Sequence, residues 1–178
     1  FGARRVGDVK KLMKIVNPQY SILTGINDQH LQTFKTEENI RQEKCRILDV
    51  GDGTCVINAE LKNITENVLL KKKVIPETIY AGLDESADIY AKNLSVNSYG
   101  SEFDVVVGDD IYRARTTILG IHNVQNIMLA VAMAVKLGVE MPYILHAIEN
   151  LQPVAHRQQL LKGNGINIID DSFNSNPD

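Results

Sequence analysis

The chain has 178 residues, of which 44% are hydrophobic and 23% are charged, and its formal net charge is −3 at pH 7. This length predicts one domain with a single large core, and the charge excludes the basic surface that nucleic acid or an anionic membrane requires. The longest apolar run, from Ile127 to Val135, is far shorter than the roughly 20 residues of a membrane span. The two cysteines, Cys45 and Cys55, indicate thiols in a reducing cytoplasm rather than a disulfide framework or a four-ligand zinc site.

Helix and strand patterns alternate in the first third of the chain. Residues 8–16 have apolar side chains at helical spacing, with Asp8 as the expected N-cap. Residues 20–24 form a short apolar run that is typical of a buried parallel strand. A further helix is predicted from about Thr36, because Glu residues lie near its start and Lys and Arg near its end.

The middle of the chain contains mostly strand patterns. Residues 54–58 and 79–82 are predicted strands, with a short helix near 61–70 between them. Residues 103–107 and 111–118 are joined by Gly-Asp-Asp and predict an antiparallel hairpin.

The last third returns to helices and ends in a strand. Residues 122–137 predict a buried helix, and residues 142–151 predict a second helix. Residues 165–169 predict an apolar strand that is followed by Asp170 and Asp171. In open α/β sheets ligands bind beyond the carboxyl ends of the strands. We therefore expect three polar clusters along one edge of the sheet: residues 24–30, 120–126 and 170–176.

His30 and Lys44 are the first candidates for chemistry. His30 follows a predicted strand, where an imidazole can reach a ligand or a metal, although a histidine there is more often a loop or capping residue. Lys44 lies in a helix whose Ile40, Ile47 and Leu48 are expected to pack inward, and a lysine in such a helix is more often a solvated surface residue. Both interpretations stay open for each residue.

Residues 120–126 combine a glycine turn with the start of a helix. A helix N-terminus has unpaired backbone N–H groups and favours anions. The amides of Asn123 and Asn126 both donate and accept hydrogen bonds, as the edge of a purine base requires. N-capping by His122 or Asn123 is the alternative, and it would explain only one of the two asparagines.

Residues 170–177, Asp-Asp-Ser-Phe-Asn-Ser-Asn-Pro, offer carboxylates for ribose hydroxyls or for a metal. The alternative is a turn rich in Asx residues. Arg157 precedes the predicted strand and can make a forked phosphate contact, or it is a surface charge. The chain contains no G-x-x-x-x-G-K-[ST], G-x-G-x-x-G or G-x-S-x-G motif. The residues alone thus predict an α/β domain with a candidate nucleotide site.

Four segments together resemble the central domain of the Mur ligases, ATP-dependent enzymes that join amino acids to the peptidoglycan precursor. These segments are residues 1–8, 22–31, 120–126 and 168–177. The resemblance implies that residues 1–178 form a three-layer α/β ATP-binding domain, with a mostly parallel sheet and a smaller antiparallel β portion. It also implies that the upstream phosphate loop and the flanking N- and C-terminal domains lie outside this sequence.

The resemblance also assigns roles to site residues. His30 is similar to the family's magnesium-ligating histidine, and Lys44 falls where these ligases carry a carbamylated lysine. Carbamylation would turn a cation that repels Mg²⁺ into an oxygen ligand. His30, Lys44 and Arg157 are accordingly the expected catalytic residues.

ATP is the second expected ligand. By resemblance, Asn123 and Asn126 contact ATP, Arg157 lies near its phosphates and Asp171 holds its ribose. His156 replaces a glycine that often precedes the arginine in this family.

The last segment favours the branch of the family that adds D-alanyl-D-alanine to UDP-N-acetylmuramoyl-tripeptide. In the implied reaction, the tripeptide carboxylate attacks the γ-phosphate of ATP, and the amine of D-alanyl-D-alanine then displaces phosphate from the acyl phosphate. We expect a cytoplasmic monomer with no nucleic-acid or membrane partner. We also expect the 178-residue polypeptide alone to be inactive and to bind ATP poorly, because it has no phosphate loop.

Two alternatives remain. The first is another amide ligase of the same fold, similar to cyanophycin synthetase, folylpolyglutamate synthetase or a lipid-II-amidating enzyme. The second is a non-catalytic α/β binding module, in which His30 and Lys44 would lie apart.

Overall fold

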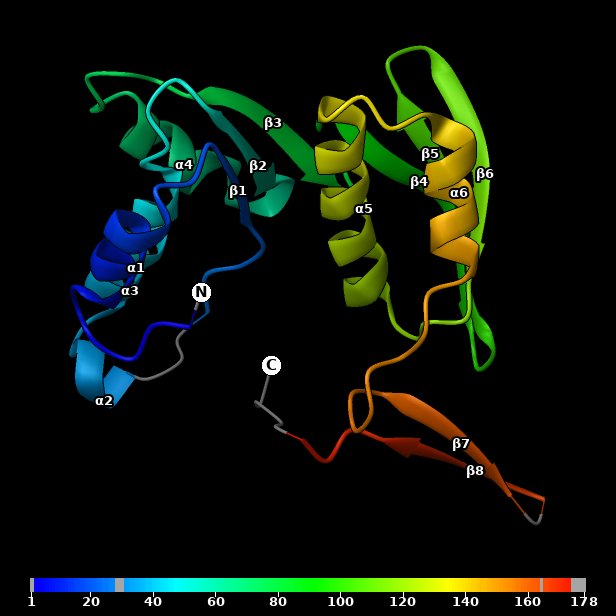
Figure 1. Cartoon of the computed structure of the whole chain (residues 1–178). Coiled ribbons are helices and arrows are strands. Elements are labelled where there is room, and N and C mark those ends of the chain that lie inside the picture. Colours follow the sequence, from blue (N-terminus) through cyan, green and yellow to red (C-terminus); the bar gives the residue numbers. More distant parts are fainter. Residues whose placement is uncertain (1, 28–30, 164, 174–178) are drawn as a thin grey trace. The chain divides into compact units, whose positions relative to one another are not determined.

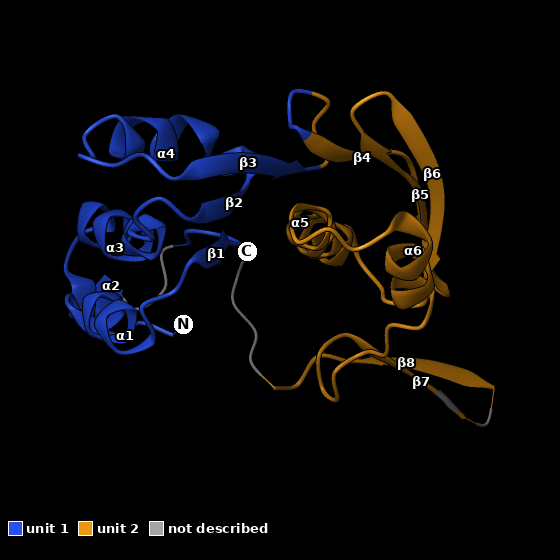
Figure 2. Cartoon of the chain, turned by 45° about the horizontal axis from the view of Figure 1, so that its top comes forward, with its two compact units in different colours: residues 1–82, 86–88 blue, residues 83–85, 89–178 orange. Residues whose placement is uncertain are grey.

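The computed structural model describes residues 2–27, 31–163 and 165–173. The chain divides into two compact units (Figure 2). The first consists of Phe1–Gly82 with Ser86–Asp88, and the second of Leu83–Glu85 with Ile89–Asp178. The expectation that residues 1–178 form one domain stays a prediction, and each unit is described by itself.

The first unit is built on three parallel strands (Figure 1). They are β1 (Tyr20–Leu23), β2 (Thr54–Asn58) and β3 (Glu77–Gly82). Strand β2 pairs with β1 on one side and with β3 on the other, and all five of its residues are buried. A strand buried on both faces is mostly apolar, and the central residues Cys55, Val56 and Ile57 made residues 54–58 predictable from the sequence. The polar ends are hydrogen-bonded, Thr54 to Glu77 and Asn58 to the Thr24 carbonyl.

Helices pack on this sheet through a shared apolar core. The core joins Val9 and Met13 of α1 to Cys55 and Ile57 of β2 and to Leu69 of α4. The α-helices of this unit are α1 (Asp8–Val16), α2 (Leu31–Phe34), α3 (Glu37–Lys44) and α4 (Lys62–Leu69). Two short 3-10 helices, η1 (Cys45–Leu48) and η2 (Ala59–Leu61), adjoin α3 and α4.

The prediction that Asp8 is the N-cap of the first helix is wrong. Gly7 occupies the cap position, in a left-handed conformation that glycine adopts without strain. Asp8 is the first helical residue, and its carboxylate accepts hydrogen bonds from the backbone N–H groups of Arg4 and Arg5. The carboxylate therefore orders the segment before the helix, and these bonds lower the pKa of Asp8.

The second unit contains the predicted antiparallel hairpin and a third strand beside it. The three strands are β4 (Ile89–Asn97), β5 (Gly100–Val107) and β6 (Asp110–Thr116), and β5 pairs with both of the others. Helix α5 (Ile121–Lys136) packs on β4 and β5, and α6 (Met141–Glu149) packs beside β6. Both predicted helices are thus confirmed, and the chain is an α/β protein.

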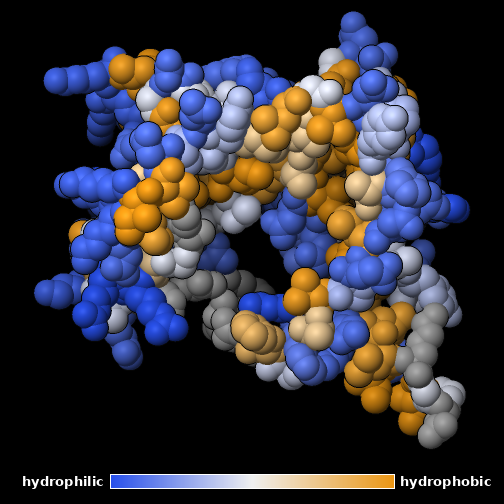
Figure 3. Space-filling view, in the orientation of Figure 1, coloured by the Kyte–Doolittle hydropathy of each residue, from blue (hydrophilic) through white to orange (hydrophobic). Residues whose placement is uncertain are grey.

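Strand β8 (Ile166–Asp170) is present, but it does not belong to the sheet that contains the other predicted strands, as the expected row of three polar clusters along one sheet edge required. It pairs with β7 (Gln159–Gly163) in a separate antiparallel sheet of two strands. The partner was missed because residues 159–163 carry no clear strand pattern. In this two-stranded sheet, the β7–β8 ribbon, Ile166, Ile168 and Ile169 are more than half exposed. Figure 3 shows apolar side chains gathered over the β7–β8 ribbon at the lower right.

The cysteines are free, as the sequence indicated, and both are buried. Burial raises the pKa of the Cys45 thiol to about 11, and it also raises the pKa of Cys55. Both thiols are therefore protonated at neutral pH and poor nucleophiles. Within the described part of the chain, no helix has the length and the apolar character needed to cross a bilayer.

Candidate functional site

One pocket of the second unit is lined by four of the residues that the sequence singled out. They are Asn123 and Asn126 of α5, Arg157 before β7, and Asp171 after β8. The pocket has a volume of about 350 Å³, and we call it the α5 pocket. Its other lining residues are Ile118, His122, Gln152, Pro153, Val154 and Gln158.

Helix α5 contributes the two amides. Asn123 and Asn126 are three residues apart and therefore lie on the same face of the helix. The Nδ2 of Asn123 donates to the carbonyl of Leu119 at 2.7 Å. The Asn126 side chain is exposed and makes no hydrogen bond to any other described residue. Its donor and its acceptor are both available to a ligand.

The start of α5 is not capped by a side chain. The cap residue is Gly120, with a φ of 89°, and no side-chain hydrogen bond covers the first turn. A Cβ atom on Gly120 would lie 2.6 Å from the His122 ring and 2.9 Å from Oε1 of Gln158. Because Gly120 is the cap residue, the interpretation of His122 or Asn123 as an N-cap is wrong. The backbone N–H of Asn123 donates to the Gly120 carbonyl at 3.1 Å, so the N–H groups of Ile121 and His122 are the ones that stay open to an anion.

Arg157 reaches the pocket from a short segment before β7. Its guanidinium lies over the ring of Phe173, 4.3 Å from the ring centroid. The residue is exposed, and no carboxylate of the described chain pairs with it. The guanidinium thus keeps its charge and its hydrogen-bond donors for a ligand.

The two aspartates after β8 have different surroundings. Asp170 accepts from the hydroxyl and the N–H of Ser172, and its Oδ2 lies 2.8 Å from Nδ1 of His156. These contacts, led by the Ser172 hydroxyl, lower the pKa of Asp170. Asp171 lines the pocket, and its Oδ1 accepts from the backbone N–H of Gln158 at 3.3 Å. Asp170 is therefore committed to local structure, whereas Asp171 retains acceptor capacity.

The predicted metal residues cannot be compared as a pair. His30 lies outside the described residues. Lys44 is the last residue of α3, is half-buried and belongs to the first unit. Across the residues that the structure describes, no three His, Cys, Asp or Glu side chains are grouped to hold a metal ion. Lys44 fits a magnesium site only as a carbamate, because its ammonium would repel the ion.

Glu43, the residue before Lys44, connects α3 to the start of α1. Glu43 is 1% exposed, and its Oε1 accepts from the backbone N–H groups of Val9 at 2.8 Å and Lys10 at 3.4 Å. Its Oε2 lies 3.1 Å from Nε of Arg46. The negative charge thus sits at the N-terminus of α1, where the helix dipole favours it. Glu43 is structural, and no local sequence pattern indicated this long-range contact.

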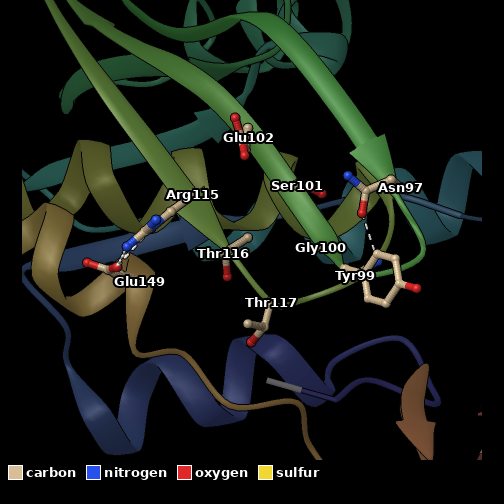
Figure 4. Close-up of a pocket in the computed structure, with 9 residues that line it drawn as sticks. All are labelled: Asn97, Tyr99, Gly100, Ser101, Glu102, Arg115, Thr116, Thr117 and Glu149. Carbon is tan, nitrogen blue, oxygen red and sulfur yellow. Dashed lines mark hydrogen bonds and ion pairs between the residues drawn. The ribbon is translucent and has the colours of Figure 1, made fainter. Parts of the chain in front are cut away.

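A second pocket of about 350 Å³ lies between the strand ends and α6 (Figure 4). None of the sequence-predicted site residues lines it. Arg115 pairs with Glu149 across it, and the backbone N–H of Tyr99 donates to Asn97 at 2.8 Å. Ser101 also lines it, with a buried hydroxyl that has no hydrogen-bond partner among the described residues. We call it the β-end pocket.

Comparison with known proteins identifies a family. A family model described as the Mur ligase middle domain matches residues 1–134. The UDP-N-acetylmuramoyl-tripeptide--D-alanyl-D-alanine ligase of Mycobacterium tuberculosis is 26% identical, over 100% of this chain and 35% of its own length. The UDP-N-acetylmuramate--L-alanine ligase of Dictyoglomus turgidum is 29% identical, over 86% of this chain and 32% of its own length. The chain thus spans about a third of the length of these relatives.

Solved structures give the same picture. A crystal structure of MurF from Acinetobacter baumannii matches 99% of this chain and 39% of its own, with a TM-score of 0.85 and 25% identity. MurF ligase from Thermotoga maritima in complex with ADP matches 98% of this chain and 40% of its own, with a TM-score of 0.84 and 21% identity. At that lower identity the likeness concerns the fold alone.

Proposed function

As this chain belongs to the Mur ligase family, we propose that it is the ATP-binding part of a ligase that adds D-alanyl-D-alanine to UDP-N-acetylmuramoyl-tripeptide. The observation that carries the proposal is the α5 pocket, where residues 34 positions apart in sequence, Asn123 and Arg157, line one cavity together with Asp171. The name of the ligase from Mycobacterium tuberculosis supports this choice of substrates.

Three polar side chains of the α5 pocket, those of Asn126, Asp171 and Arg157, have counterparts in ATP. An amide such as that of Asn126 can donate to and accept from the edge of adenine at the same time. The Asp171 carboxylate can accept from two ribose hydroxyls, and the Arg157 guanidinium can bind phosphate oxygens in a forked geometry. The open N–H groups of α5 add positive potential to the same pocket.

The proposed reaction has two steps. An oxygen of the tripeptide carboxylate attacks the γ-phosphorus of ATP, the bond to the β,γ-bridging oxygen breaks, and ADP leaves. The amine of D-alanyl-D-alanine then attacks the acyl carbon, phosphate leaves, and the nitrogen loses a proton. The first step brings two anions together, so Arg157 would act by offsetting the charge on the phosphates.

Magnesium is part of the proposal, with His30 and carbamylated Lys44 as the residues that would hold it. The ion would add positive charge beside the phosphate oxygens. Lys44 has a fixed position in this structure, because α3 is anchored by buried Ile40 and Glu43. A rigid support of this kind is what a metal ligand needs.

The test uses the full-length ligase and its Asp171→Ala variant. The variant removes a charged hydrogen-bond acceptor, so we expect ATP affinity to fall about tenfold, with the affinity for UDP-N-acetylmuramoyl-tripeptide unchanged. Isothermal titration with each ligand measures both. Glu149→Ala, which alters the β-end pocket, is the matched control and should leave both affinities unchanged. Equal losses for ATP and the sugar nucleotide in Asp171→Ala would contradict a ribose contact.

A second candidate is a ligase of the same family that adds L-alanine to UDP-N-acetylmuramate. The similarity to the Dictyoglomus turgidum ligase favours it. Release of ADP with each pair of acceptor and amine separates the two candidates. Turnover with UDP-N-acetylmuramoyl-tripeptide and D-alanyl-D-alanine supports the first, and turnover only with UDP-N-acetylmuramate and L-alanine replaces it.

A further inference from the structure

The backbone around Arg157 is held in an unfavourable conformation. His156 has a φ of 63° and Gln158 has a φ of 47°. Both values lie in the left-handed region, which glycine occupies freely and other residues avoid. Such a conformation persists only where its surroundings fix it, and it is found most often at functional sites. We therefore looked for the contacts that hold this segment.

Three contacts tie the segment to the end of β8. The imidazole Nδ1 of His156 lies 2.8 Å from Oδ2 of Asp170, and the His156 carbonyl accepts from the backbone N–H of Phe173 at 3.2 Å. The backbone N–H of Gln158 donates to Asp171 at 3.3 Å. An aspartate is ionised at neutral pH, so the hydrogen bond between Asp170 and His156 is a charge-assisted one, and this bond contributes to the lowered pKa of Asp170. Both residues that flank Arg157 are thus fixed.

Phe173 restrains the Arg157 side chain itself. The guanidinium carbon is 4.3 Å from the ring centroid, which is within the range of a cation–π contact. An exposed arginine otherwise samples many rotamers, and ordering it on ligand binding costs conformational entropy. Stacking covers one face of the guanidinium and leaves its N–H edge free. The ring thus prepares Arg157 to bind without occupying its donors.

We propose that His156, Asp170 and Phe173 form a clasp that positions Arg157 for the phosphates of a nucleotide. The inference rests on the proposed function, which puts a nucleotide in the α5 pocket. The clasp would strengthen binding of the nucleotide's phosphates and leave binding of the base and the ribose unchanged. The three residues are positioning residues. Phe173 stacks on Arg157, His156 precedes it in the chain, and Asp170 holds the His156 ring. None of them is assigned a contact with the nucleotide.

The test compares ATP with adenosine in the full-length ligase, because only ATP carries the phosphates. Phe173→Ala and His156→Ala each remove one part of the clasp. We expect each to weaken ATP binding about fivefold, the size of one cation–π or charge-assisted contact, and to leave competition by adenosine unchanged. Tyr143→Ala is the matched control, since Tyr143 and Phe173 are aromatic residues that are both 68% exposed.

Conservative variants separate positioning from folding. Phe173→Tyr keeps the ring and should bind ATP as the wild type does. His156→Asn should recover part of the loss, because asparagine tolerates the left-handed region and its amide can donate to Asp170. Once Arg157→Ala has removed the guanidinium, adding Phe173→Ala should cause no further loss of ATP affinity.

Two results would overturn the clasp. One is wild-type ATP affinity in both Phe173→Ala and His156→Ala while Arg157→Ala binds weakly. The other is an equal loss of ATP and adenosine in the clasp variants, which would mean that they damage the whole pocket. If the wild type binds no ATP, or if Arg157→Ala binds it as tightly as the wild type, the proposed function fails instead.

Discussion

The α5 pocket and the β-end pocket have the same volume, about 350 Å³, but differ in what their polar groups do. In the β-end pocket Arg115 pairs with Glu149, so the two charges neutralise each other. In the α5 pocket Arg157 forms no ion pair with a carboxylate of the described chain, although Asp171 also lines the pocket, and the Asn126 side chain makes no hydrogen bond there. Cavity size alone therefore does not identify a ligand site. Polar groups that are held in place yet remain uncommitted are the better guide.

The largest expected effect comes from replacing the arginine of the α5 pocket by alanine, with the arginine of the β-end pocket as the comparison. Arg157→Ala should weaken ATP binding by about ten- to a hundredfold, because it removes charged hydrogen bonds to phosphate. Arg115→Ala should leave ATP affinity unchanged, because that guanidinium already pairs with Glu149. Titration of the full-length ligase with Mg-ATP measures both. Similar losses of ATP affinity in the two variants would contradict the assignment of ATP to the α5 pocket rather than to the β-end pocket.

A smaller effect is expected at the start of α5. Gly120→Ala introduces a Cβ that would lie 2.6 Å from the His122 ring and also strains a backbone with a φ of 89°. We expect a loss of roughly 1–2 kcal/mol in the free energy of unfolding from the strain, together with a severalfold loss of ATP affinity from the contact.

Gly108→Ala is the matched control for this variant. Gly108 also has a positive φ, of 59°, but no atom lies within 4 Å of its Cβ position. It should lose a similar amount of stability, as measured by urea unfolding, and should keep its affinity for ATP. Equal affinities in the two alanine variants would show that the start of α5 takes no part in binding.

The smallest effect is expected at Ser101 in the β-end pocket. Its buried hydroxyl has no partner in the described residues, so removing it relieves a desolvation penalty. Ser101→Ala should therefore unfold at the same temperature as the wild type or at a slightly higher one, with unchanged ATP affinity. A clear fall in Tm, or in ATP affinity, would mean that the hydroxyl is used and that the β-end pocket has a role of its own.

Local patterns were enough to predict most of the fold. Strand β2 and the hairpin of β5 and β6 lie where continuous apolar runs and a Gly-Asp-Asp turn indicated them. Of the three residues expected to pack inward, Ile40 of α3 and Leu48 of η1 are buried and Ile47 is half-buried. The family resemblance is confirmed by the middle-domain match. These features depend on neighbouring residues, which a single sequence displays directly.

Features that depend on distant partners could not be predicted. The Glu43 contact with α1 joins residues 34 positions apart, and the pairing of His156 with Asp170 depends on the β7–β8 ribbon. For the site, Asn123, Asn126, Arg157 and Asp171 were selected in advance, and the structure brings them to one pocket. Their roles and those of His30 and Lys44 stay predictions.

The buried carboxylate of Glu43 has a consequence for the residue beside it. Glu43, near the end of α3, accepts hydrogen bonds from two backbone N–H groups in the first turn of α1. These bonds link the two helices. Lys44 is the next residue after Glu43. A displacement of its backbone would therefore either move α1 as well or break the Glu43 hydrogen bonds and expose the Glu43 carboxylate to solvent. If the proposed ligase changes conformation during catalysis, we expect the backbone of Lys44 to keep its position relative to α1.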